Sequence, residues 1–172
     1  ASSVTLAELT AIPTSFPGVL PVEERVGKTA VIKTERGDIT VELEGNLAPK
    51  TVSNFIALAY TGFYDGLTFH RREEGFVIQG GDPNGNGSGG PGYTVDAEIV
   101  QELKHDAYVI ATARLGDSVN PTRASSGSQF YITLAPAPFL DGAYTVFGRV
   151  IDGTDVVDAI QVGDEIVTVE VR

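Results

Sequence analysis

The stretch Ser128–Leu134 reads SQFYITL, and large apolar side chains alternate in it with polar ones. In an extended strand successive side chains point to opposite faces, so Phe130 and every second residue after it share one face. The other face carries Gln129, Tyr131 and Thr133. The apolar face belongs in a core, whereas the opposite face presents an amide and a phenol on the outer surface. The stretch therefore predicts a half-buried β-strand.

A second strand, Phe76–Gln79, places Val77 and Gln79 on one face by the same alternation. If it lies beside Ser128–Leu134, two glutamine side chains meet among apolar groups, and this combination indicates a ligand groove. A pair of ordinary surface amides is the alternative that the pattern leaves open.

Much of the remaining chain also has the character of strands, with apolar and β-branched runs bounded by glycine or polar turns. These further predicted strands are Val31–Thr34, Ile39–Leu43, Leu67–Arg71, Ala107–Ala113, Tyr144–Val150 and Ile166–Val171.

Two predicted helices interrupt the strands. The first begins at Pro49, which suits a first helical turn, continues with apolar residues at helical spacing, and ends near Gly62. The second covers Asp155–Gln161. Because strands are many, helices few and regular β-α alternation absent, the pattern favours an antiparallel barrel over a doubly wound sheet.

Residues 1–27 differ from the rest, since Pro13, Pro17 and Pro21 recur among small and hydroxyl-bearing residues. Proline at this density opposes a continuous helix or a central strand. We expect an N-terminal extension that lies on the domain or is partly mobile, followed by one domain over residues 28–172.

The chain has 172 residues, a formal net charge of −11, and neither cysteine nor methionine. The acidity disfavours nucleic acid and anionic membranes as partners, and no run approaches the roughly 18 apolar residues of a membrane span. The lack of cysteine excludes disulfides, thiolate catalysis and zinc thiolate sites. Because position 1 is not methionine, we expect a processed or trimmed chain, and a secreted, periplasmic or lumenal location is slightly favoured over the cytoplasm.

The sequence offers weak candidates for metal or nucleophilic chemistry. The loop from Asp82 resembles the first half of a calcium loop, but its twelfth position is Tyr93 instead of glutamate and no helices flank it. His70 and His105 are too few and too isolated for a metal site. We therefore expect no metal and no cofactor, and a site made of a fixed charge, amides and rings.

Two separated groups of segments carry a family resemblance. The first is Phe69–Arg71 (FHR) with Gly75–Asp82 (GFVIQGGD), and the second is Gly127–Ile132 (GSQFYI) with Phe139–Gly142 (FLDG) and Val146–Gly148 (VFG). Together they resemble the cyclophilin family of peptidyl-prolyl cis-trans isomerases. The resemblance implies a mainly β fold, a closed eight-stranded antiparallel β-barrel capped by two α-helices. It also implies a monomer that acts on proline-containing peptides and unfolded proteins and assists folding.

The resemblance also implies the site residues. Arg71 takes the position of the catalytic arginine, and Gln79 joins it in the catalytic set; a surface ion pair with Glu73 or Glu74 is the alternative for Arg71. The substrate-binding residues that the resemblance implies are Phe76, Val77, Ala113, Arg114, Gln129, Tyr131, Phe139, Leu140 and Tyr144.

Several positions depart from the eukaryotic pattern of the family. Where that pattern has methionine, phenylalanine, tryptophan and histidine, this chain has Val77, Tyr131, Phe139 and Tyr144. Arg114 replaces an asparagine, and residues 115–125 form a longer connection. Phe139, Arg114 and Tyr144 are closer to the prokaryotic branch. Since the family's tryptophan donates its indole N–H to cyclosporin, the resemblance implies weak cyclosporin sensitivity.

Two rival functions remain at this stage. A non-catalytic binding or chaperone domain would keep the groove and hold proline-containing segments, but Arg71, Phe76 and Gln129 together favour the enzyme. A calcium- or sugar-binding β domain rests only on the glycine- and asparagine-rich loop after Asp82.

Overall fold

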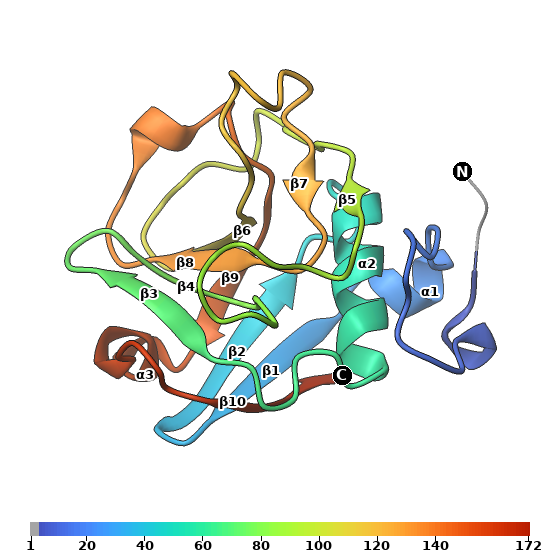
Figure 1. Ribbon diagram of the computed structural model, residues 1–172, viewed down its shortest axis with the longest axis horizontal. Coiled ribbons are helices and arrows are strands. Elements are labelled where there is room, and N and C mark those ends of the chain that lie inside the picture. The colour runs from blue at the N-terminus through green and yellow to red at the C-terminus, as the bar shows by residue number, and fades with distance from the viewer. Residues whose placement is uncertain (1–3) are drawn as a thin grey trace.

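In the computed structural model, which describes residues 4–172, ten strands form one large and one small sheet (Figure 1). The strands are β1 (Thr29–Thr34), β2 (Gly37–Leu43), β3 (Phe69–Glu73), β4 (Val77–Gly80), β5 (Thr94–Val95), β6 (Val109–Thr112), β7 (Ser125–Ser126), β8 (Phe130–Thr133), β9 (Val146–Asp152) and β10 (Ile166–Val171).

The large sheet has eight strands in the order β10-β1-β2-β9-β6-β8-β4-β3, and β5 pairs with β7 in the small one. All neighbouring strands run antiparallel. The eight strands expected from the sequence are all present, with β10 at its predicted bounds and β3 two residues later than predicted. The prediction of an eight-stranded antiparallel fold is confirmed.

The expectation of a closed barrel goes too far. The end strands β10 and β3 do not pair along their length and meet at the isolated bridge between Thr68 and Glu165. Around it, the Phe69 N–H donates to the carbonyl of Asp164 at 2.9 Å. The sheet is therefore a curled half-barrel. Contact between the two edges is limited to the start of each strand, where four backbone hydrogen bonds join residues 66–69 to residues 163–166.

The inner face of the curled sheet carries the main hydrophobic core. Along β8, Phe130 and Ile132 are at most 1% exposed and belong to this core, as the alternation predicts. Tyr131 and Thr133 are buried as well, so the expectation of a half-buried strand is wrong. The ring of Phe130 meets Phe69 and Phe55 edge-on, with centroids 6.0 and 6.1 Å apart. Edge-to-face contacts are a favourable geometry for buried rings.

Helix α2 (Pro49–Tyr60) covers the core at one end of the barrel and begins and ends where the sequence predicts. Pro49 occupies the first turn, and Gly62 just beyond the helix has a φ of +81°. The free N–H groups of Lys50 and Thr51 donate to the carboxylate of Glu98, 2.9 and 2.7 Å away. An anion at a helix N-terminus satisfies these groups and opposes the helix dipole.

The N-terminal segment lies against the outside of α2 (Figure 1). Its Leu20 is 1% exposed and its N–H donates to the Ser53 hydroxyl at 2.9 Å. Arg25 donates to the carbonyls of Leu20 and Gly45, at 2.9 and 2.6 Å. This segment contains the 3₁₀ turn η1 (Leu6–Glu8) and the helix α1 (Val22–Arg25), and the sequence did not predict the helix. The domain boundary at residue 27 stays a prediction.

Two further elements complete the described chain. Helix α3 (Thr154–Ala159) packs near β2, slightly shorter than predicted, and the 3₁₀ turn η2 (Pro138–Leu140) follows β8. Within residues 4–172, none of the helices has the length and apolarity that crossing a bilayer requires.

Candidate active site

Strand register aligns the outer-face residues in one row. Arg71 on β3 lies opposite Gln79 on β4, Gln79 lies opposite Tyr131 on β8, and Tyr131 lies opposite Ala111 on β6. Residues directly opposite in an antiparallel pair have their side chains on the same face. The pairing therefore brings together side chains that are up to 60 positions apart.

A chain of hydrogen bonds fixes the polar side chains of this row. One Nη of Arg71 donates to Gln79 Oε1 at 2.9 Å, and Gln79 Nε2 donates to Gln129 Oε1 at 3.0 Å. Gln129 Nε2 then donates to the carbonyls of Gly87 and Gly89, at 2.9 and 2.7 Å. Because a guanidinium can only donate, the orientation of both amides follows from Arg71.

Arg71 also forms the ion pair that the sequence offered as an alternative. Its second Nη lies 2.9 Å from Glu73 Oε1, while Glu74 pairs with Arg72 instead. The guanidinium carbon lies 6.0 Å from the centre of the Phe76 ring. The ion pair does not remove Arg71 from the groove, because a guanidinium has five N–H donors and only two are used by these side chains.

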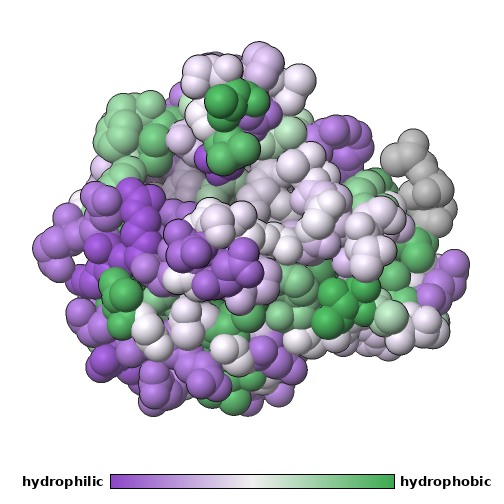
Figure 2. All heavy atoms as spheres, in the orientation of Figure 1, coloured by the Kyte–Doolittle hydropathy of each residue, from purple (hydrophilic) through white to green (hydrophobic). Residues whose placement is uncertain are grey.

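Nine of the eleven predicted site residues surround one groove of about 240 Å³, named here the outer groove. In Figure 2 the surface is recessed between hydrophobic side chains over η2 and hydrophilic ones over β3. The lining residues are Arg71, Phe76, Val77, Gln79, Ala113, Arg114, Tyr131, Leu140 and Tyr144.

The other two predicted residues lie at its margins. Gln129 lines an adjoining groove of about 600 Å³, which shares Gln79, Ala113 and Arg114 with the first. Phe139 is 73% exposed and stacks on Phe76, with ring centroids 5.6 Å apart and planes at 28°. It extends the apolar rim without lining the groove itself.

Arg114 stands at the junction of the two grooves. Its guanidinium lies 4.4 Å from the centre of the Tyr144 ring, and its Nε donates to the carbonyl of Ala143 at 2.7 Å. Both backbone groups of Ala113 are used, by Gln129 and Ser126. Among residues 4–172, neither the backbone N–H nor the backbone carbonyl of Arg114 has a hydrogen-bond partner.

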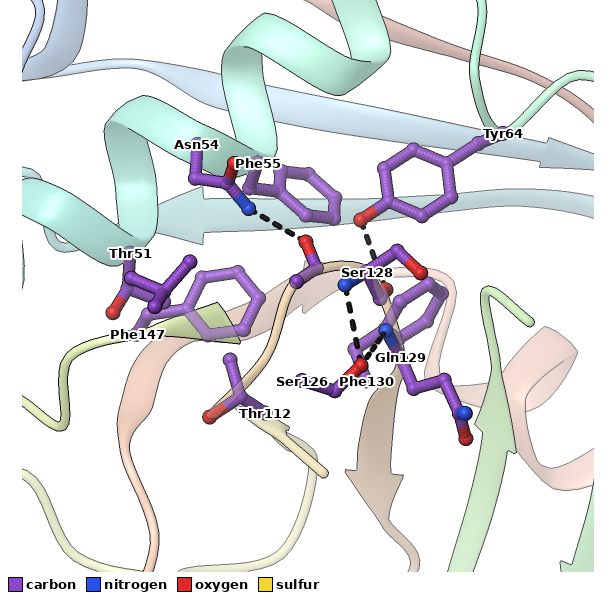
Figure 3. A pocket seen from close by; sticks show the side chains of 12 residues that line it. Thr51, Asn54, Phe55, Tyr64, Thr112, Ser126, Ser128, Gln129, Phe130 and Phe147 are labelled. Atoms are coloured by element: carbon purple, nitrogen blue, oxygen red, sulfur yellow. Dashed lines mark hydrogen bonds between the residues drawn. The ribbon is translucent and has the colours of Figure 1, made fainter. Parts of the chain in front are cut away.

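Asn54 of helix α2 and Tyr64, which follows this helix, hold the segment that leads into β8 and bears Gln129 (Figure 3). Asn54 donates to the carbonyl of Gly127 at 2.6 Å, and the Tyr64 hydroxyl donates to that of Ser128 at 3.0 Å. The N–H of Gln129 itself donates to the Ser126 hydroxyl at 3.0 Å. These bonds surround a cavity of only about 10 Å³, so this pocket supports the groove and has no room for a substrate.

The chain has relatives among known proteins. The family model "Cyclophilin type peptidyl-prolyl cis-trans isomerase/CLD" matches residues 29–171. A peptidyl-prolyl cis-trans isomerase of Synechococcus elongatus is 44% identical over 144 residues, 83% of this chain and 94% of that protein. One of Helicobacter pylori is 45% identical over 152 residues, 86% of this chain and 90% of that protein. The chain belongs to the cyclophilin family.

Solved cyclophilin structures agree with this assignment. The crystal structure of a cyclophilin type isomerase from Cryptosporidium parvum has a TM-score of 0.76 and 35% identity, covering 84% of this chain and 97% of that one. A second structure of it, in the presence of the dipeptide Ala-Pro, has a TM-score of 0.75, 33% identity, and covers 84% and 98%. The chain is thus a cyclophilin-type peptidyl-prolyl cis-trans isomerase.

The glycine-rich loop of this cyclophilin is organised by Asp82, which is 1% exposed. Its carboxylate accepts the N–H groups of Asn84, Asn86 and Gly87. Burial works to raise the pKa of Asp82, and these N–H groups together with that of Gly89 outweigh it, so the pKa lies below its ordinary value. The carboxylate holds the loop whose carbonyls in turn hold Gln129.

Sequence reasoning missed two residues behind the outer groove. His105 bonds to the Tyr131 hydroxyl through one ring nitrogen and to the Asp141 carboxylate through the other. Their spacing of 36 residues carries no motif, and a lone histidine is no signal for a site. The tyrosine in place of the family's phenylalanine was the available hint, because a buried hydroxyl requires a partner.

Proposed function

We propose that the outer groove binds proline-containing peptides and that Arg71 speeds rotation about the X-Pro bond by stabilising the twisted amide. The support is the position of the guanidinium, held by Gln79 and Glu73 at the edge of a pocket walled by Phe76, Leu140 and Tyr131. The relative from Cryptosporidium parvum was solved with Ala-Pro, a ligand of the same class.

Amide physics explains why this arrangement suffices. Resonance keeps the peptide planar behind a barrier of about 18–20 kcal/mol. The cis and trans forms of an X-Pro bond differ by only about 1 kcal/mol, so the rate is the obstacle. In the twisted state the proline nitrogen regains its lone pair and accepts a hydrogen bond. A donor that reaches the nitrogen only in that state stabilises it selectively, which is the requirement for catalysis.

The other residues divide the remaining work of holding a peptide. Phe76, Val77, Tyr131 and Leu140 hold the proline ring, and Phe139 extends this surface at the rim. The two glutamines present fixed amide groups to the peptide backbone. The free N–H and carbonyl of Arg114 can pair with an extended segment, while Ala113 and Tyr144 shape the wall beside it. Unfolded proteins with exposed X-Pro bonds are the class of substrate, so the reaction assists folding.

Substitution of Arg71 tests the proposal. Arg71→Ala should lower kcat/KM on an X-Pro tetrapeptide about 10²–10³-fold, the usual loss for one transition-state donor. Arg71→Lys should lose nearly as much, because lysine lacks the planar fork. A protease-coupled assay or exchange NMR measures the rate, and chemical denaturation checks the fold.

Arg72→Lys is the matched control. Arg72 is the next residue of β3, its side chain is 14% exposed, and it pairs with Glu74 and the carbonyl of Ile160 away from the groove. It should keep full activity. If Arg71→Ala isomerises within a factor of a few of the unmodified chain, Arg71 is not the catalytic group. If the unmodified chain binds the peptide without turnover, it is a holding domain.

A further inference from the structure

We propose that His105 is a positioning residue, which holds two walls of the outer groove in place through the hydroxyl of Tyr131. The proposal rests on the proposed function, since these walls are the ones assigned to the proline ring. The three residues His105, Tyr131 and Asp141 are called the imidazole tie.

All four hydrogen-bonding groups of His105 are used. Its backbone N–H and its ring Nδ1 both lie close to Asp141 Oδ1, at 2.7 and 2.8 Å. Its ring Nε2 lies 2.8 Å from the Tyr131 hydroxyl, and its carbonyl accepts the N–H of Ala137 at 2.8 Å. The side chain is only 1% exposed. The imidazole therefore has one orientation.

The positions of the protons in the imidazole tie follow from the ionisation of Asp141 and His105. Partial burial works to raise the pKa of Asp141, and the bonds from the backbone and ring of His105 outweigh it, so the carboxyl is ionised at neutral pH. An ionised carboxylate can only accept, so Nδ1 of His105 carries a proton. Burial lowers the pKa of His105 despite Asp141, so the ring is neutral and Nε2 accepts the Tyr131 proton.

The tie joins two separate walls of the outer groove. Tyr131 belongs to β8, whereas Asp141 follows directly on Leu140 in the turn at the opposite side. Tyr144 packs edge-on against both rings, at 5.8 Å from Tyr131 and 6.4 Å from His105. The distance between strand and turn, and hence the width of the groove, is set through the imidazole.

Packing alone does not account for this arrangement. A phenylalanine at position 131 would fill the same space without a polar atom. The tyrosine brings a buried donor, which costs free energy unless an acceptor is placed for it. The only recorded partner of its hydroxyl among residues 4–172 is His105. The Tyr131 hydroxyl and the His105 imidazole thus act as a pair. Neither should help to position the groove once the other has been removed.

A double-mutant cycle measured on kcat/KM tests the imidazole tie. Tyr131→Phe removes the hydroxyl, and His105→Asn keeps a donor for Asp141 but cannot reach position 131. Each single change should lower kcat/KM about 10-fold, below the roughly 100-fold that an ångström of misplacement can cost. The double variant should lose no more than either single one. Independent losses that multiply to about 100-fold would overturn the tie, because residues that merely stabilise the fold act additively.

Three further measurements separate positioning from folding. His105→Gln, whose side chain reaches further than asparagine, should recover several-fold of the loss; equal losses for both amides contradict the proposal. Tyr108→Phe removes a hydroxyl bonded to Asp158 near α3 and should leave kcat/KM unchanged. In the unmodified protein, ¹⁵N NMR should show His105 protonated at Nδ1 alone at neutral pH, and the opposite tautomer overturns the tie even if His105→Asn fails to fold.

The imidazole tie can be tested even if the proposed catalytic function fails. If the unmodified chain turned over no X-Pro bond, the proposed catalysis would fall. The same double-mutant cycle, measured on the affinity for an Ala-Pro peptide, would still test the imidazole tie. Losses of affinity that are coupled would support it, and additive losses would refute it.

Discussion

The two faces of β8 are built on different principles, although they alternate residue by residue. The inner face, with Phe130 and Ile132, packs into the main hydrophobic core through apolar contacts. On the outer face Tyr131 belongs to a second, smaller apolar cluster, and directed hydrogen bonds fix both Tyr131 and Gln129. The inner face stabilises the fold, and the outer face holds its groups in one orientation for a ligand.

This difference predicts which property each kind of substitution changes. Burial is non-directional and scales with area, so damage to the inner face appears as lost stability. Hydrogen bonds contribute little net stability but fix geometry, so damage to the outer face appears in rate or affinity.

Phe130→Ala should lower the free energy of unfolding by about 3–5 kcal/mol, the usual cost of deleting a buried phenyl group. Phe130 is 1% exposed and touches three other rings, so little can collapse into the space. Urea denaturation measures the loss. Gln129→Ala on the outer face is the comparison and should lower stability less but activity more. If Gln129→Ala lowered stability more than Phe130→Ala does, the two faces would not differ in the way described.

Cyclosporin should inhibit the enzyme only weakly, and Phe139→Trp should improve inhibition several-fold. The family's tryptophan donates an indole N–H that Phe139 lacks, and an unpaired ligand carbonyl costs about 1–3 kcal/mol, or 5- to 150-fold in affinity. Phe139 is exposed at the rim, so the exchange should leave the fold intact. Inhibition constants for both proteins decide the matter.

Tyr60→Trp serves as the control for that experiment. Tyr60 is an exposed aromatic residue of α2, 56% accessible, and does not line the outer groove. It should leave inhibition unchanged. Nanomolar inhibition of the unmodified protein, or no gain from tryptophan at position 139, would refute the expectation.

Asp82→Asn should lower stability by about 1–2 kcal/mol at neutral pH, because a carboxylate accepts the loop N–H groups better than an amide does. The folded-state pKa of Asp82 is lowered, so its contribution is complete above the ordinary carboxyl pKa of about 4 and is lost as the pH falls below it. The stability gap between the two proteins should therefore close in acid. A gap that stays constant down to about pH 2 would contradict this account.

The smallest expected effect is that of calcium, which should neither bind the loop specifically nor change activity. Position twelve of the loop is Tyr93, whose hydroxyl donates to Asn54 at 2.6 Å, and the Asp82 oxygens already accept backbone N–H groups. Calorimetric titration checks this. Micromolar binding of one calcium ion per chain would show that the loop has a function outside the groove.

The sequence was sufficient for much of the fold because its signals are local. Alternation along β8, the proline at the start of α2 and the glycine after its end each act within a few residues. Full barrel closure was expected from resemblance and was overstated, because the meeting of β3 with β10 depends on the twist of the whole sheet. Helix α1 was missed because it has only four residues, too few for a periodic pattern.

The candidate site divides in the same way. The motif resemblance predicted eleven site residues, and nine of them line the outer groove. Only the folded chain shows that Phe139 stands at the rim and that His105 bonds both Tyr131 and Asp141. The same holds for the backbone groups of Arg114, which have no partner among residues 4–172. The physical reason is that periodicity reports one strand at a time, whereas hydrogen bonds between residues 26 and 36 positions apart depend on strand order, register and the path of the turns.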